Sequence, residues 1–460
     1  MILISEILKK YLASDFLLDL MEITLTQRGT DKPLVLQGKG TVAFGKRYPH
    51  FALRMYSDLG QKPPLGMRRW PGSEKVSPGD AFPAHHFFDF EATDLHGEKW
   101  HCDEITVRPI AGRGVVFTCN LPTLTCVSPS PMQDDCDQVT MYFLRNLEIP
   151  FTTYVERRSE ADGKLLYTGL GLEHHESEAG GFDFVASRVE NHRDVCFIRV
   201  ASPKSALVDS AETRINEALS YALARPLQAP ISERWQGEKQ TVTLRPLDLE
   251  KREFDLPGRF EPPVSPNRVL IAKDFWKLFS AYFVYVAADP IASRPHPLSH
   301  QLLRVLLASR SSLDMTGLVV CIAVEGLLKL NEFSDIPFPV SEDASERQRN
   351  CGSVKTSRAK VSPINKLRTL QQHGLVSKES IEAWKYLRDR TAHGEMSTDE
   401  RREPEFARAS FSVYALLNRL VFLVIQYHGQ HTDFSKSGWP NEAFHGGHFQ
   451  TLRLQWKQPT

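Results

Sequence analysis

The sequence predicts an α+β protein of two domains, an N-terminal antiparallel β-sandwich-like domain followed by a C-terminal all-α helical bundle. At 460 residues the chain exceeds what one ordinary hydrophobic core supports. Short β-branched and aromatic stretches fill its first half, and apolar residues at helical spacing fill its second. A proline-rich segment separates the two patterns. We therefore expect a β-rich sensor or specificity domain at 1–250, a linker at 251–267, a bundle at 268–430 and a tail packed on the bundle at 431–460.

Alternation of apolar and polar residues predicts antiparallel strands through most of the first half. The stretch Phe182-Asp183-Phe184-Val185 shows the period of two that places every second side chain on one face. An amphipathic helix is expected at the N-terminus, and a second helix within this domain at Ser210–Leu223. Strands are expected at Glu22–Thr26, Lys39–Phe44, His50–Tyr56, His86–Ala92, Trp100–Val107, Gly114–Cys119, Val139–Phe143, Phe151–Glu156, Phe182–Ser187, Asp194–Ala201 and Gln240–Leu244.

The charge balance limits the partners that the chain can bind. Lys+Arg and Asp+Glu are both 56, so the formal net charge is zero and a broad electrostatic attraction to nucleic acid is not supported. Any RNA contact must rest on a local patch, which suits single-stranded loops better than a long duplex. No membrane segment is expected, because the N-terminus lacks a basic region before its apolar residues and the apolar run Leu416–Ile425 is interrupted and too short.

The placement of cysteines and histidines predicts neither a disulfide framework nor a metal centre. The seven cysteines are scattered without a C-x-x-C pair, which favours reduced thiols in the cytoplasm. His101 with Cys119, Cys126 and Cys136 could gather a metal, but none of their spacings matches a usual ligand hairpin. Adjacent histidines on a strand point to opposite faces, so the pairs at 85–86 and 174–175 are expected at strand surfaces. We expect no metal and no cofactor.

Helical periodicity in the second half predicts a bundle. Leu313–Leu330 is its most apolar segment and holds one acid, Glu325. A carboxylate in such a helix must lie on a surface stripe or be paired when buried. We expect Glu325 to be a structural partner of an arginine or a backbone amide, with a catalytic role as the alternative. Helices are expected at Arg268–Ala288, Leu298–Ala308, Leu313–Leu330, Pro363–Gln372, Ser377–His393 and Glu405–Tyr427.

The segment 376–394 is expected to form a helix that ends in an arginine, a carboxylate and a histidine. Ser377 suits an N-cap, and Gly394 suits the left-handed residue that closes a helix. An apolar stripe leads to Arg388, which is expected on or beside the buried face. The stripe consists of Ile381, Trp384 and Leu387.

Arg388, Asp389 and His393 form the strongest chemical pattern in the chain. Asp389 lies four residues before His393, the spacing at which helical side chains touch, so it could fix the imidazole tautomer. The pattern resembles the R-x(4–6)-H motif of HEPN domains, with the polar residue that follows the arginine in those domains. Two other stretches have the spacing, but prolines break Arg294–His300 and no carboxylate follows the arginine in Arg368–His373.

The resemblance extends over roughly Ser265–Gln430 and is nearest to the Apea-type HEPN domains of bacterial anti-phage abortive-infection proteins. It implies a metal-independent ribonuclease that works as a homodimer through the C-terminal bundle. It also implies that Arg388 stabilises charge on phosphorus and that His393 exchanges protons, with Asp389 in support. The partner's histidine would supply the second proton-transfer group. Glu325 would hold Arg388 in place.

The polar segment Glu332–Val361 is the notable source of positive charge near this motif. Lys355, Arg358 and Lys360 would bind phosphate if the segment acts as a flap, and a solvated loop is the alternative. Arg390 is a further candidate RNA contact. The resemblance implies a phage component as the trigger at the β-rich domain and a host RNA such as tRNA as the target.

RNA can be cut without a metal when its 2′-hydroxyl attacks the adjacent phosphate, which leaves a 2′,3′-cyclic phosphate and a 5′-hydroxyl. DNA lacks that nucleophile. The alternative function is a non-catalytic ligand- or nucleotide-binding scaffold that uses the bundle for dimerisation. In that case Arg388 only forms a salt bridge with Glu325, and His393 is a cation stabilised at a helix end.

Overall fold

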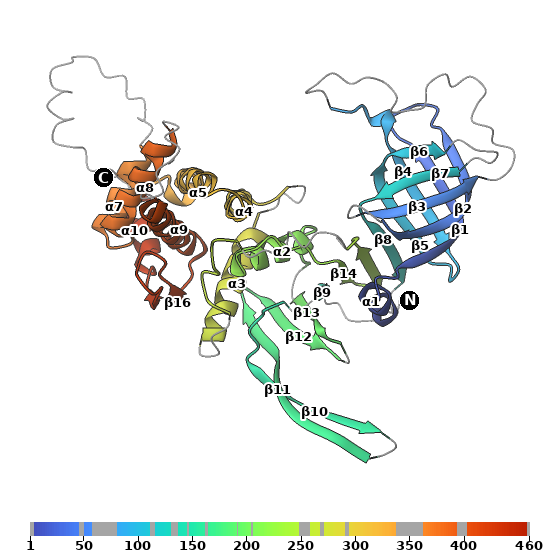
Figure 1. Ribbon diagram of the computed structural model, residues 1–460, viewed down its shortest axis with the longest axis horizontal. Helices are drawn as coiled ribbons and strands as arrows, with labels where there is room; N and C mark the ends of the chain where they lie inside the picture. The colour runs from blue at the N-terminus through green and yellow to red at the C-terminus, as the bar shows by residue number, and fades with distance from the viewer. Residues whose placement is uncertain are drawn as a thin grey trace. The chain divides into compact units, whose positions relative to one another are not determined.

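The computed structural model divides the chain into two compact units that interleave along the sequence. In Figure 1 the helices from residue 272 onward, which belong to unit 2, run from yellow-green to red. Unit 1 comprises Met1–Leu147, Glu173–Leu207 and Gln228–Asp255, and unit 2 comprises Glu148–Leu172, Val208–Leu227 and Leu256–Thr460. The structure describes residues 4–45, 50–57, 81–110, 116–129, 137–144, 147–161, 164–190, 192–203, 206–247, 258–266, 271–289, 294–336, 362–392 and 403–457.

The strands that the sequence predicts form because one side of each is apolar. In the strand at 51–57, Phe51, Leu53 and Met55 are buried, whereas Arg54 and Tyr56, which alternate with them, are exposed. The strands are β1 (Leu17–Gln27), β2 (Val35–Phe44), β3 (Phe51–Ser57), β4 (Phe88–Asp94), β5 (Lys99–Ile105), β6 (Val107–Ile110), β7 (Val116–Leu121), β8 (Leu124–Pro129), β9 (Asp137–Leu144), β10 (Thr153–Ala161), β11 (Lys164–Ala179), β12 (Phe182–Val189), β13 (His192–Ser202), β14 (Ile231–Gln236) and β15 (Lys239–Leu244).

The structure describes one curled sheet where the sequence predicted a sandwich of packed sheets. Its 15 strands follow the order β10-β11-β12-β13-β9-β14-β15-β8-β5-β4-β1-β2-β3-β7-β6. Neighbouring strands are antiparallel wherever the register is defined. Figure 1 shows β1 to β7 wrapped around a shared interior. The physical reason is that a twisted sheet with one apolar face can curl over itself, so it buries that face without a second sheet.

The first helix, α1 (Ile4–Leu12), covers part of the core of unit 1. Its Tyr11 is 1% exposed, and the ring packs at 5.4 Å from Phe16 and 5.0 Å from Phe44. The Tyr11 hydroxyl donates to the carbonyl of Arg245 at 3.1 Å, which satisfies the buried polar group. Burying an aromatic side chain of this size contributes about 2–3 kcal/mol, so the predicted amphipathic helix belongs to this core.

The helices of unit 2 pack around α9. This helix contacts α5 and α8, and α5 also lies against α4 and α8. The helices are α2 (Ala211–Ala222), α3 (Ala272–Ala287), α4 (Pro297–Ala308), α5 (Leu313–Leu327), α7 (Pro363–Gln372), α8 (Lys378–Ala392), α9 (Glu403–Ile425) and α10 (His448–Lys457), and a hairpin of β16 (Gly429–Thr432) and β17 (Asn441–Phe444) follows α9. The large antiparallel sheet before residue 250 and the helices after it make the chain an α+β protein.

The helix α2, expected with the β-rich half, packs against α3 and α4 of unit 2. Its Arg214 is fully buried and donates to both carboxylate oxygens of Glu217 at 3.1 Å. Glu217 also accepts hydrogen bonds from Ser299 Oγ at 2.9 Å and from the backbone N–H of His296 at 3.1 Å. This network ties α2 to the start of α4, a long-range contact that no local pattern signals.

The longest helix, α9, is buried for most of its length. Its segment Pro404–Ile425 is long and apolar enough to cross a membrane by length and composition, although the sequence analysis counted a shorter apolar run. Of its most apolar window, 78% is buried inside the structure, a pattern typical of the core helix of a soluble protein. Within the described residues, no other helix passes the same test.

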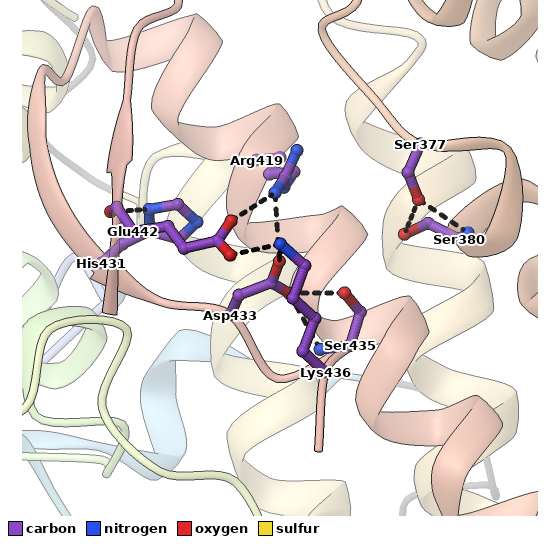
Figure 2. Close-up of polar contacts among 8 residues, drawn as sticks. All are labelled: Ser377, Ser380, Arg419, His431, Asp433, Ser435, Lys436 and Glu442. Carbon is purple, nitrogen blue, oxygen red and sulfur yellow. Dashed lines mark hydrogen bonds and ion pairs between the residues drawn. The ribbon is translucent and has the colours of Figure 1, made fainter. Parts of the chain in front are cut away.

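A buried carboxylate, Asp433, stabilises the hairpin after α9. Asp433 is 1% exposed and accepts hydrogen bonds from the backbone N–H of Ser435 at 3.0 Å and from Arg419 Nη2 at 3.2 Å (Figure 2). Burial alone raises the pKa of Asp433, but the hydrogen bonds from Ser435 and the charges of Arg419 and Lys436 outweigh it and hold that pKa below its ordinary value. The tail therefore packs on the helices through a satisfied ionic network.

Candidate functional site

The two helices that carry the candidate site begin at serine caps. Ser312 Oγ accepts a hydrogen bond from the backbone N–H of Met315 at 3.3 Å at the start of α5. Ser377 Oγ accepts from the backbone N–H of Ser380 at 3.1 Å at the start of α8 (Figure 2). Each cap satisfies an N–H group that has no partner inside its helix. The cap predicted at Ser377 is confirmed.

The apolar stripe of α8 ends at Arg388. Ile381, Trp384 and Leu387 are 3%, 2% and 0% exposed. The Arg388 side chain is 51% exposed, so it lies at the border between the packed face and solvent. A charged group in this position is accessible to solvent and can still be oriented by contacts with neighbouring side chains.

Glu325 and Trp384 are neighbours of the Arg388 side chain in the described part of the chain. Arg388 Nε donates to Glu325 Oε1 at 2.7 Å, and its guanidinium carbon lies 5.4 Å from the centre of the Trp384 ring. Trp384 in turn donates its indole N–H to the carbonyl of Cys321 at 3.5 Å. The carboxylate and the ring restrict the guanidinium from two sides, which is the arrangement expected of a pre-oriented anion-binding group. The predicted partnership of Glu325 with an arginine is present.

The apolar stripe predicts a packing role for Trp384 but not its contact with Arg388. The signal was available, because the two residues are four apart in a predicted helix and therefore lie on the same side. Cys321, beneath this site, is unsuited to nucleophilic chemistry. Burial, with the nearby charge of Glu325, raises the pKa of its thiol to about 12 in spite of Arg388.

The other polar residues of the motif lie on different sides of α8. Asp389 is exposed. Arg390 lies 5.0 Å from the centre of the Tyr386 ring and donates to the Tyr386 hydroxyl. Two residues along an α-helix turn by about 200°, so Arg390 does not face the same phosphate as Arg388 within one copy of α8.

Several predicted site residues fall outside the described part of the chain. These are His393 and the three cations of the polar segment, Lys355, Arg358 and Lys360. The backbone of α8 is helical to Ala392, so the described structure stops one residue before the histidine. Of the predicted set, it brings Arg388 and Glu325 together and leaves the remaining roles as predictions.

An apolar stripe on α5 borders the Arg388 site. Met315 and Ile322 are 48% and 46% exposed, and they lie seven residues apart, which is two helical turns. Glu325 follows Ile322 by three residues on the same side of the helix. Periodicity does not distinguish this side of α5 from the rest, because most residues of the helix are apolar. The two side chains are exposed apolar area on the helix that carries Glu325.

The expected surface positions of the histidine pairs are wrong in part. His85 and His86 lie in a short 3-10 turn, Ala84–His86, before β4, and His86 is buried. The pair on β11 alternates as expected, although one of its two rings is buried. His174 is partly exposed and bonds Glu176, whereas the adjacent His175 is buried and bonds Ser177. The two rings therefore point to opposite faces. Among the residues that the structure describes, no group of three or more His, Cys, Asp or Glu is placed to hold a metal ion.

Comparison of the chain with protein-family models, with curated proteins and with solved structures finds no match. The interpretation of the site therefore depends on the geometry around Arg388 and on the motif in the sequence.

Proposed function

We propose that the chain is a metal-independent endoribonuclease of the HEPN type that acts in anti-phage defence in the cytoplasm. The observation that carries the proposal is the position of Arg388, a half-exposed guanidinium oriented by Glu325 and Trp384. It lies five residues before His393, at the spacing of the motif. An arginine and an imidazole that act on one phosphate are the minimal pair for stabilising a phosphorane and moving protons near neutral pH.

The proposed reaction is attack of the RNA 2′-hydroxyl on the adjacent phosphorus. One proton leaves the 2′-oxygen and one is delivered to the departing 5′-oxygen, while Arg388 neutralises charge on the phosphoryl oxygens. A single histidine cannot be base and acid at once. We infer that a homodimer supplies the second His393, and the exposed Met315 and Ile322 beside Glu325 provide apolar area for such an interface. Host RNA such as tRNA and a phage-derived trigger remain parts of this proposal.

A second candidate function has its own support. The ion pair between Arg388 and Glu325 accounts for the arginine without any substrate. In that case the helices form a non-catalytic scaffold that binds a ligand or a nucleotide, and the α5 stripe serves only to assemble two copies. The two candidate functions differ in one outcome, because the ribonuclease cleaves RNA and the scaffold leaves it intact.

The test is incubation of the purified chain with total cellular RNA in EDTA. The proposal expects discrete cleavage products that disappear in Arg388→Ala and in His393→Ala. Lys378→Ala is the matched control, since Lys378 is a 69% exposed cation on the same helix, paired with Glu382. Intact RNA with the native chain, or equal cleavage by native and Arg388→Ala proteins, would favour the scaffold.

A further inference from the structure

The solvent-facing side of unit 1 carries a cluster of cations around one tyrosine. Lys39 on β2, Arg54 and Tyr56 on β3 and Arg108 on β6 are all exposed, and Tyr56 is 50% exposed. We refer to these four residues as the basic face. In Figure 1 their strands lie side by side in the blue and cyan part of the chain.

The strand register places the four side chains on one surface. Lys39 is directly opposite Tyr56, and Arg54 and Arg108 are both opposite Thr118, on the two sides of β7. Residues directly opposite each other in a sheet point to the same side. The core residues alternate with them, since Leu53 and Met55 beside Arg54 are buried. Neighbouring strands are about 4.8 Å apart, so the face spans about 15 Å from β2 to β6.

The cations of this face are available for a ligand. Within the described residues, no carboxylate lies at ion-pair distance from Lys39, Arg54 or Arg108. Arg28, which follows the end of β1, differs, because it pairs with Asp89 at 3.5 Å and Glu104 at 2.8 Å. Unpaired exposed cations in one place are notable in a chain whose formal net charge is zero.

The tyrosine selects among anionic partners. The Arg54 guanidinium carbon lies 5.6 Å from the centre of the Tyr56 ring, so an exposed aromatic surface stands directly beside positive charge. Stacking rings among cations bind single-stranded nucleic acid, in which bases are accessible and phosphates follow the same path. A duplex hides its bases, and an acidic peptide would gain little from the ring. Thr118 lies between Arg54 and Arg108, and Thr41 lies opposite Arg54 on β2, so the face also carries hydroxyl groups that can accept or donate hydrogen bonds to sugar and base edges.

We propose that the basic face of unit 1 binds single-stranded RNA. The choice of RNA over DNA rests on the proposed ribonuclease function, whereas the binding itself does not require cleavage. Exposed acids at Asp19 and Glu22 lie on the next strand, β1, so the bound strand follows β2, β3, β7 and β6 and stops short of β1.

The experiment is fluorescence anisotropy with a labelled 12-nucleotide single-stranded RNA, in EDTA, on the full chain carrying Arg388→Ala to prevent cleavage. Tyr56→Leu is expected to weaken binding at least about fivefold, and Tyr56→Phe is expected to restore it. Lys39→Ala, Arg54→Ala and Arg108→Ala are each expected to reduce the slope of log affinity against log salt by about 0.7. Tyr154→Leu and Arg28→Ala are controls, an exposed tyrosine outside the face and a paired arginine just after β1.

The proposal is overturned if Tyr56→Leu binds like its parent, if the chain binds no RNA, or if a DNA strand of the same sequence binds more tightly. Cleavage assays on chains with Arg388 intact separate this proposal from the proposed function. If the chain cuts no RNA but Tyr56→Leu weakens RNA binding, the proposal for the basic face holds and the ribonuclease proposal is rejected. If the chain cuts RNA and Tyr56→Leu binds RNA as tightly as its parent, the proposal for the basic face is rejected and the ribonuclease proposal holds.

Discussion

Two arginine–glutamate pairs of unit 2 have opposite surroundings. Arg214 and Glu217 are 0% and 9% exposed, whereas Arg388 and Glu325 are 51% and 28% exposed. Burial raises the pKa of Glu217 in spite of the adjacent guanidinium, which shows that desolvation outweighs the pairing there. The first pair can only be structural, since no ligand reaches it. The second leaves a guanidinium in contact with water, where a phosphate can replace solvent.

Breaking the buried pair is expected to have the largest effect on stability. Glu217→Ala leaves the Arg214 charge buried without its main partner and removes the acceptor for Ser299 and for the N–H of His296. The free energy of unfolding is expected to fall by about 3–5 kcal/mol. Urea denaturation followed by circular dichroism measures it, and a loss under about 1 kcal/mol would contradict the structural role.

Acidification is expected to weaken the same buried region. Burial lowers the pKa of His296 to about 4, while the charges of Asp289, Arg214 and Glu332 modify that shift. A histidine with a folded-state pKa below its unfolded value of about 6.5 contributes full stability above pH 6.5 and loses it as the pH falls towards 4, because the unfolded chain binds the proton first.

The loss from this one group reaches about 3 kcal/mol at pH 4. His296→Asn is the matched variant, since asparagine can retain the cap in which His296 Nδ1 accepts from the N–H of Leu298, and asparagine does not titrate. Between pH 7 and pH 4, the free energy of unfolding should fall less in the variant than in the native chain. Parallel curves for the two proteins would show that His296 is not the titrating group.

Breaking the exposed pair is expected to separate stability from activity. Glu325→Ala should change the free energy of unfolding by less than about 1 kcal/mol, since half-exposed ion pairs are screened by water. RNA cleavage should fall at least about tenfold, because Arg388 loses the group that fixes its Nε. A stability loss as large as that of Glu217→Ala, without loss of cleavage, would make both pairs structural.

The smallest effect is expected from Lys378→Ala on the same helix. Its ion pair with Glu382 spans 3.7 Å between side chains that are 69% and 61% exposed. The variant should unfold within about 0.5 kcal/mol of the native chain and cut RNA equally. If Lys378→Ala lost RNA cleavage, removal of any cation from α8 would reduce activity. The loss in Arg388→Ala would then not indicate a specific role of Arg388.

Local patterns predicted the local structure well. The cap at Ser377, the stripe from Ile381 to Leu387 and the strand at 51–57 depend on neighbours within one turn or one pleat, and the structure contains all three. The strand β8 at 124–129 and the strand β14 at 231–236 were missed, because flanking prolines and polar residues obscure their alternation.

Long-range arrangements were not predictable in the same way. The single curled sheet depends on which strands pair across the chain, and the placement of α2 depends on Glu217 accepting hydrogen bonds from residues about 80 positions away. The basic face likewise appears only when β2, β3, β7 and β6 are set side by side, since its residues lie between positions 39 and 108. The Glu325–Arg388 pair was reached through the resemblance to HEPN domains rather than through periodicity.

The most direct test of the central claim is the chemistry of the RNA ends. Mass spectrometry of fragments made by the native chain in EDTA should show 2′,3′-cyclic phosphates and 5′-hydroxyls, with no such fragments from Arg388→Ala and an unchanged yield from Lys378→Ala. Fragments with 3′-hydroxyls and 5′-phosphates, or cleavage that EDTA abolishes, would contradict the proposed mechanism.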